Sequence, residues 1–185
     1  MTPLTQYTIE TKRLLLKAFT QEVYQQAFTN LTDTELKELF GHANDEELAK
    51  EKDRFDKGLT SFNKSFLYFQ IRDKQTNRFM GWCGYHTWYI PHFRAEAFYR
   101  LEHESDRRKG LMAEAFLEVL KYGFNEMGLV RVEAFAAADN EASLATLKKF
   151  GFRQEGLFRK HYHYEGVNTD SVAFGLLKEE FINII

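Results

Sequence analysis

Several kinds of residue and segment are scarce in this chain of 185 residues, and each scarcity excludes a class of protein. Cys83 is the only cysteine, so an intramolecular disulfide framework and a zinc site made of several cysteines are excluded. The 11 glycines and two prolines form no linker-like stretch, which predicts a single domain over residues 1–185. The longest hydrophobic run, Ala134–Ala138, has five residues, whereas a membrane-spanning helix needs about 20.

An excess of one charge is also missing, because 25 basic and 27 acidic side chains leave a net charge of −2. No half of the chain is strongly basic, so we predict no direct nucleic-acid partner and no membrane partner. The opening residues, MTPLTQYTIE, lack a basic segment followed by an apolar stretch, which predicts no signal peptide and a cytoplasmic location. We also predict no metal site, because His161 and His163 have no cysteine or carboxylate pattern beside them.

The periodicity of apolar residues predicts strands and helices in a mixed order. Leu14, Leu16 and Ala18 alternate with charged residues, as in a half-buried strand. Other segments repeat at helical spacing. The predicted strands are 11–19, 65–73, 78–89, 95–104, 131–138, 152–164 and 169–177; the predicted helices are 21–30, a polar helical region over 32–60 broken near Gly41, 110–127 and 140–150. This order predicts an α+β (mixed α/β) domain with one sheet of about seven strands flanked by helices.

A basic turn joins the predicted strand 95–104 to the predicted helix 110–127. Arg107, Arg108 and Lys109 precede Gly110, which begins the helix. A helix N-terminus offers free backbone N–H groups and a partial positive charge, and glycine allows close approach of a ligand. The turn is therefore either a cradle for a phosphate or pyrophosphate or a charged surface turn that starts a helix.

The same turn resembles the acetyl-CoA signature of the GNAT N-acetyltransferases, R-x-x-G-x-(small), followed here by Glu114-Ala115. Further segments resemble the family over about residues 8 to 181. They are TKRLLLKAF at the first strand, Asn140-x-x-Ser143 with Gly151-Phe152, Glu155-Gly156 with Arg159, and Asp170 with Leu176, Leu177 and Glu180. The most similar branch is that of the ribosomal-protein N-terminal (Rim-type) acetyltransferases. Met112 departs from the small residue of the signature, and the segment from Glu96 to the signature is one residue longer than the pattern, which suggests a bulge.

The resemblance implies a mostly antiparallel GNAT-like sheet that splays apart between strands 95–104 and 131–138. Acetyl-CoA, the implied acetyl donor, would lie in this opening, with the pantetheine arm placed like an added strand. Its pyrophosphate would lie on the amides of residues 108–113, and a backbone N–H of residues 101–103 would stabilise the developing oxyanion. The implied cofactor-binding residues are Leu101, Glu102, His103, Arg107, Arg108, Lys109, Gly110, Leu111, Met112, Ala113, Asn140 and Ser143.

The resemblance also implies catalytic roles. Ser143 is the predicted acid for the leaving thiolate, although its hydroxyl can equally satisfy the first turn of a helix. Glu96 is the predicted base, directly or through water, and its alternative is a surface glutamate. Tyr99 and His103 are reserve candidates. Asn140 either caps the helix, binds the pantetheine arm, or does both.

The acceptor is the least determined feature. The first hypothesis is an N-acetyltransferase for a protein N-terminal α-amine, such as that of a ribosomal protein; the alternatives are a small-molecule amine (polyamine, amino acid or antibiotic) or a catalytically silent acyl-CoA-binding module. Aromatic residues make up 16% of the chain and are dense over residues 82–99. One face of these strands must pack on the core, and the other predicts an acceptor cleft with Tyr85 and Trp88 in its wall. A monomer and a homodimer both stay open.

Overall fold

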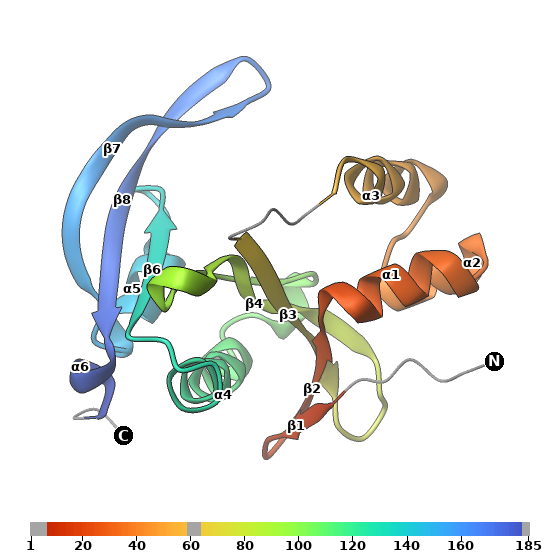
Figure 1. Cartoon of the computed structure of the whole chain (residues 1–185), viewed down its shortest axis with the longest axis horizontal. Helices are drawn as coiled ribbons and strands as arrows, with labels where there is room; N and C mark the ends of the chain where they lie inside the picture. Colours follow the sequence, from red (N-terminus) through yellow and green to blue (C-terminus); the bar gives the residue numbers. More distant parts are fainter. Residues whose placement is uncertain (1–6, 59–63, 183–185) are drawn as a thin grey trace.

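The computed structural model describes residues 7–58 and 64–182, and all the strands in these ranges form one sheet (Figure 1). The sheet has eight strands in the order β1-β2-β3-β4-β5-β6-β8-β7. Every neighbouring pair is antiparallel except β5 and β6. The strands are β1 Thr8–Glu10, β2 Leu14–Phe19, β3 Lys64–Asp73, β4 Phe79–Tyr89, β5 Arg94–Leu101, β6 Arg131–Ala136, β7 Arg153–Tyr164 and β8 Val167–Leu177.

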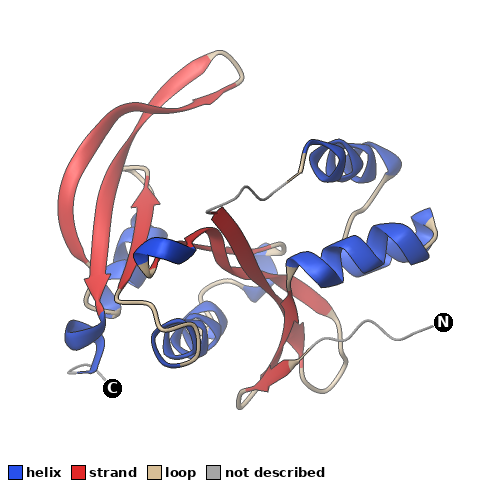
Figure 2. Ribbon diagram, in the orientation of Figure 1, coloured by secondary structure: helices blue, strands red, loops and turns tan. Residues whose placement is uncertain are grey.

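Helices cover both faces of this sheet, as Figure 2 shows. They are α1 Gln21–Asn30, α2 Asp33–Phe40, α3 Asp45–Lys57, α4 Leu111–Asn125, α5 Glu141–Lys149 and α6 Lys178–Ile182, with 3₁₀ turns at Ile90–His92 and Glu104–Asp106. The side chains of Thr20, Thr32, Asn44 and Asn140 cap α1, α2, α3 and α5 by accepting backbone N–H groups. Among the described helices, none has the length and hydropathy of a membrane span.

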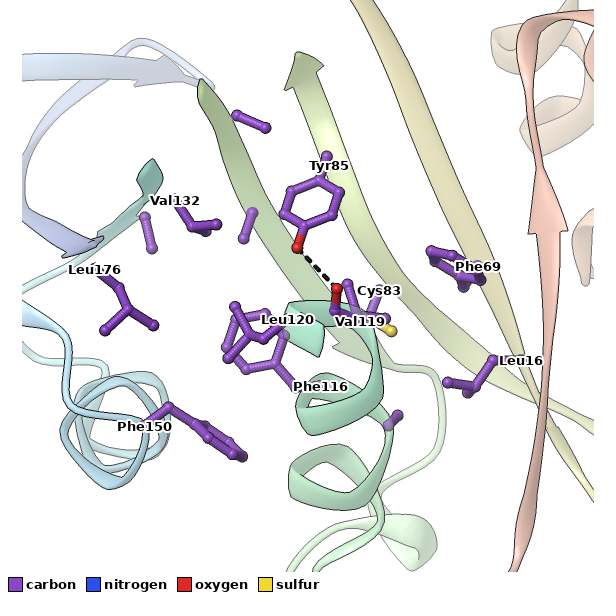
Figure 3. Packing of buried hydrophobic residues seen from close by; sticks show 14 of the residues in the cluster. Leu16, Phe69, Cys83, Tyr85, Phe116, Val119, Leu120, Val132, Phe150 and Leu176 are labelled. Atoms are coloured by element: carbon purple, nitrogen blue, oxygen red, sulfur yellow. Dashed lines mark hydrogen bonds between the residues drawn. The ribbon is translucent and has the colours of Figure 1, made fainter. Parts of the chain in front are cut away.

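Two hydrophobic clusters lie on opposite faces of the sheet. One packs α4 and α5 against the sheet around Phe116, Leu120 and Val132 (Figure 3). The other packs α1, α2 and α3 against β3 and β4 around Phe19 and Trp82. Each fully buried Leu or Phe side chain stabilises the fold by about 1.5–3 kcal/mol. Most of the aromatic surplus therefore serves two cores, one on each side of the sheet.

The sheet is continuous except at its centre. Strands β5 and β6 pair only over Arg94–Glu96 and Arg131–Glu133, where an ion pair of 2.6 Å joins Arg94 to Glu133. Beyond these residues the two strands no longer pair. The splayed GNAT-like sheet predicted from the sequence is therefore confirmed.

Some predicted boundaries are wrong, and each has a local cause. The strand predicted over 11–19 begins at Leu14, and a strand that was not predicted, β1, precedes it, because the Thr11 hydroxyl and N–H bond to Leu14 and turn the chain between β1 and β2. The sheet consequently has eight strands rather than about seven. The strand predicted over 95–104 ends at Leu101, because the 3₁₀ turn Glu104–Asp106 follows. The break predicted near Gly41 in the polar region 32–60 is confirmed, because Gly41 ends α2 and α3 begins at Asp45; residues 59–60 of this region lie outside the described residues.

Candidate active site

A cavity of about 610 Å³ opens between the end of β5, the turn before α4 and the start of α5. Its lining contains most of the residues predicted for cofactor binding: Leu101, Arg107, Arg108, Gly110, Leu111, Met112, Ala113, Asn140 and Ser143, together with Tyr99. Glu102, His103 and Lys109 do not line it, and the Lys109 carbonyl instead accepts a hydrogen bond from Arg13 at 3.0 Å. Arg100, Asp106, Ala142 and Thr146 line it although the sequence did not single them out. The sequence could have indicated Thr146, because it lies one helical turn after the predicted site residue Ser143 and so falls on the same face of the helix.

The turn before α4 is held in place by a buried carboxylate. Asp106 accepts hydrogen bonds from the Arg78 guanidinium at 3.0 and 2.8 Å, and these contacts lower the pKa of Asp106. Arg108 and Gly110 then adopt left-handed backbone conformations, with φ of 59° and 73°, which turn the chain into the helix. This ion pair thus joins the turn before α4 to Arg78, the residue that precedes β4.

The start of α4 is built differently from those of α1, α2, α3 and α5. Gly110 occupies the cap position and offers no side chain, so no capping hydrogen bond forms there. The first N–H groups of a helix have no partner within it, and those of Leu111–Ala113 lie at the cavity wall. Arg107 and Arg108 line the same wall. The arrangement suits an anion such as a pyrophosphate.

Two hydroxyl groups meet in the first cavity. The Tyr99 Oη lies 2.9 Å from the Ser143 Oγ, and Asn140 Oδ1 accepts the Ser143 N–H at 3.1 Å as the cap of α5. Burial raises the pKa of Tyr99, against the hydrogen bond from Ser143, which lowers it. The phenol therefore stays protonated near neutral pH and is able to donate.

The backbone of β5 presents only some of its amides to the opening. The Glu102 N–H donates to the Met80 carbonyl on β4 at 3.0 Å, so within the predicted segment 101–103 this amide is already engaged. Amide directions alternate along an antiparallel pair. The amides of Tyr99 and Leu101 therefore point away from β4, toward the gap beside β6, and Leu101 is the remaining oxyanion donor of the predicted segment that lines the cavity.

A second cavity, of about 270 Å³, lies on the opposite face of β5, under α1, α2 and α3. It is lined by five aromatic rings and five polar side chains: Tyr24, Phe40, Tyr68, Trp82, Phe98, His42, Glu51, Arg54, His86 and Arg100. Arg100 lines both cavities. The two spaces therefore approach each other across β5, at the end where it no longer pairs with β6.

Glu96 lies on the same face of β5 as Phe98 and Arg100, beside the second cavity. Its Oε1 is 3.2 Å from the Nε2 of His86, and its side chain is 17% exposed. His86 occupies a bulge in β4 between Tyr85 and Thr87, so the bulge suggested by the sequence lies in β4 and not in the segment after Glu96. Burial raises the pKa of Tyr162 on β7, and the nearby Glu96 charge adds to the rise. Sequence reasoning missed His86, because a bulge has no periodic signal.

The predicted aromatic wall of the acceptor cleft is wrong in its members. Tyr85 is fully buried, and its hydroxyl donates to the Val119 carbonyl of α4 at 2.9 Å (Figure 3). Trp88 packs on the α4 side and lines a separate hollow. The alternation of β4 and β5 places Trp82 and Phe98, on the other face, in the second cavity. Among the described residues, no group of His, Cys, Asp and Glu is placed to hold a metal ion.

Comparison with known proteins gives one consistent family. The family model of the acetyltransferase (GNAT) domain matches residues 13–153. The chain is 29% identical to the uncharacterized N-acetyltransferase YoaA of Bacillus subtilis over 92% of this chain and 96% of that protein. Among solved structures, a "putative ribosomal-protein-serine acetyltransferase" from Vibrio cholerae has a TM-score of 0.64 at 21% identity, covering 96% of this chain and 99% of that chain. The spermidine/spermine N-acetyltransferase SpeG of Vibrio cholerae has a TM-score of 0.67 at 18% identity, covering 92% of this chain and 96% of that chain.

Proposed function

The chain belongs to the GNAT family of acetyltransferases, which use acetyl-CoA as the acetyl donor, and we propose that its acceptor is the α-amine of a protein or peptide N-terminus. A ribosomal-protein N-terminus is the specific form of this acceptor that the sequence resemblance predicts. The observation that carries the proposal is the pair of cavities on opposite faces of β5, which share Arg100. One cavity serves the donor and the other the acceptor.

The residues of the first cavity fit the donor. The uncapped start of α4 with Arg107 and Arg108 would hold the pyrophosphate, and the β5 edge beyond Glu96 would bond the pantetheine arm. When bound, acetyl-CoA supplies an activated thioester carbonyl. The Leu101 N–H would donate a hydrogen bond to the thioester carbonyl oxygen, where negative charge develops during attack by the amine.

We assign the acid to the hydroxyl pair Tyr99 and Ser143. A thiol has an ordinary pKa of about 8.5, so a hydroxyl donor at hydrogen-bond distance assists the departure of the thiolate. The 2.9 Å contact couples the two hydroxyl groups. Tyr99 donates toward the thiolate and Ser143 orients the phenol.

Glu96 is the proposed base, and His86 is its partner. Glu96 takes the proton of the attacking amine, directly or through water. The His86 imidazole, at 3.2 Å, orients the Glu96 carboxylate and is 35% exposed, so it connects this carboxylate with solvent. An α-amine has a pKa of about 7.7–8.0, against about 10.4 for a lysine side chain, so a weak base suffices at neutral pH.

The second cavity favours a chain terminus over a polyamine. Two guanidinium groups line it, and its one lining carboxylate, Glu51, is engaged by the Tyr24 hydroxyl at 2.5 Å and by Arg54 at 2.7 Å. Of the described residues that line the cavity, none offers a free carboxylate to the several positive charges of a polyamine, and Glu96, beside the cavity, is assigned to the attacking amine. The volume of about 270 Å³ lies just below the range of about 300–1,000 Å³ of whole-ligand sites, which suits the end of a longer chain.

A release assay for the coenzyme thiol tests this proposal. We expect turnover with peptides that have a free N-terminus and none with the same peptides after chemical N-acetylation. Spermidine and spermine should be poor acceptors. Turnover with polyamines but not with any peptide would overturn the proposed acceptor, and binding of acetyl-CoA without turnover of any amine would support the non-catalytic alternative.

A further inference from the structure

One side chain in the second cavity lacks a hydrogen-bond partner. His42 lies between α2 and α3, and its ring stacks on Phe40 with 5.6 Å between ring centroids. Its Nε2 is buried and has no hydrogen-bond partner among the described residues; the nearest Glu51 oxygen is 3.9 Å away. Burial lowers the pKa of His42, against the opposing charges of Glu51 and Glu47. The imidazole is therefore neutral near pH 7 and able to donate from Nε2.

Two guanidinium groups lie around this imidazole. Arg54 and Arg100 line the same cavity, and the charge of each contributes to the lowered pKa of His42, which places both near the ring. Arg54 pairs with Glu51 at 2.7 Å, and Arg100 pairs with Glu102 at 2.7 Å while its side chain stays 66% exposed. A guanidinium has five N–H donors. Single ion pairs therefore leave donors of both side chains for a ligand.

Resting on the proposed function, we infer that His42, Arg54 and Arg100 form a subsite for a carboxylate of the acceptor, and that preferred acceptors carry Asp or Glu at their second or third residue. Planar guanidinium groups and a neutral imidazole donor match a carboxylate in shape and charge. Glu51, the carboxylate that lines the cavity, is bonded by the Tyr24 hydroxyl and by Arg54, so a ligand carboxylate would use the remaining guanidinium donors.

The spacing along β5 sets the position of this acidic residue. Glu96, beside which the amine must lie, precedes Arg100 by four residues on the same face of one strand, a separation of about 13 Å. An extended peptide advances about 3.3–3.6 Å per residue, and an acidic side chain adds its own length. A carboxylate on the second or third residue therefore reaches the subsite while the terminal amine lies at Glu96.

The test compares acceptor peptides in matched pairs. Each pair differs only by Asp against Asn, or Glu against Gln, at position 2 or 3, and each peptide ends in a C-terminal amide so that no other carboxylate is present. We expect kcat/KM for the acidic member to be about tenfold higher, mainly through KM. Equal kcat/KM values within all pairs would overturn the subsite.

Two variants locate the preference. Arg54→Gln and Arg100→Gln should each reduce the acidic preference, measured as the ratio of kcat/KM between the two members of a pair, severalfold. Lys52→Gln is the matched control on α3, because Lys52 pairs with Asp33 and does not line the cavity. His42→Gln, which keeps a donor, should retain more of the preference than His42→Phe. Loss of rate on both peptides alike in the arginine variants would contradict a carboxylate subsite.

The outcomes also separate this inference from the proposed function. If peptides are acetylated without an acidic preference, the acceptor class stands and the subsite does not. If peptides are inert and small amines react, the acceptor class is wrong. In that case the subsite is tested by comparing the acetylation rates of free α-amino acids with those of the corresponding amino-acid amides. Faster acetylation of the free carboxylates supports the subsite, and equal rates overturn it.

Discussion

The two cavities on either side of β5 are assembled in different ways. The described residues that line the first all come from two segments of the chain, 99–113 and 140–146. The second draws its lining from α1, α2, α3, β3, β4 and β5, and the contributing residues lie far apart in the chain. A donor shared by a whole family can thus be held by one local motif. The second cavity, which we propose selects the acceptor, is made of side chains that only tertiary packing brings together.

Substitution of Gly110 should weaken ligand binding in the first cavity without changing the second, and we expect it to have the largest effect of the proposed variants. Gly110→Glu places a carboxylate at the anion site and forces a left-handed conformation on a residue with a side chain. We expect acetyl-CoA binding to weaken roughly 100-fold or more by isothermal titration calorimetry. Gly128→Glu is the control, because Gly128 has a φ of 67° and open space around it but lies outside the cavity. Equal losses in both variants would mean that backbone strain, and not the anion site, is responsible.

Removal of the Glu96 carboxylate should affect the acceptor side alone. Glu96→Gln is expected to lower kcat about 10²–10³-fold, because the amine loses its proton acceptor. The affinity for acetyl-CoA should stay the same by calorimetry. His86→Gln should lower kcat less, because it removes only the partner of the base. Unchanged kcat in Glu96→Gln would show that another group or solvent takes the proton.

The hydroxyl pair gives the next effect in size. Tyr99→Phe should lower kcat roughly 10–100-fold, since the thiolate loses its donor, and Ser143→Ala should have a smaller effect on kcat. Rates are compared at saturating acetyl-CoA so that binding does not contribute. If Ser143→Ala has the larger effect, then the serine, as the sequence predicts, is the proton donor and Tyr99 orients it.

The smallest expected effect concerns stability. Asp106→Asn should lower the free energy of unfolding by about 1–2 kcal/mol at pH 7, because the charge-assisted hydrogen bonds with Arg78 are lost. The effect is kept small because the Arg78 side chain is half-exposed and water screens its charge. The pKa of Asp106 is lowered in the folded state. Its contribution is therefore complete above the ordinary aspartate value of about 3.9 and is lost as the pH falls through the folded-state pKa.

Urea denaturation of both proteins across pH measures this contribution. The difference between the wild type and Asp106→Asn should be constant from pH 7 down to about pH 5 and should shrink below it. Asp53→Asn is the control, because Asp53 and Lys57 form an exposed pair on α3 whose loss should leave stability unchanged. A difference between wild type and Asp106→Asn that persists in acid would exclude an ionic origin.

The sequence predicted what local patterns encode. The alternation in β2, the helix after Gly110 and the basic turn are all short-range signals, and each was found. The face of β4 on which Tyr85 and Trp88 lie was not predicted correctly. A bulge at His86 interrupts the alternation of β4, and the residue that bonds the buried Tyr85 hydroxyl, Val119, is 34 residues away in the chain. One signal was available: Gly123 leaves room in α4 for the Tyr85 ring. An isolated glycine inside a predicted helix often marks such a close approach.

The gap between β5 and β6 gives the sheet a third edge, in its own interior. The outer edges of a sheet are hazards, because unpaired N–H and C=O groups can pair with other chains. Beyond Glu96 the β5 edge has no strand partner among the described residues, yet α4 and α5 enclose it on one face. The chain thus keeps strand-like hydrogen-bonding groups at the wall of a cavity, where an extended ligand could pair with them as a strand would.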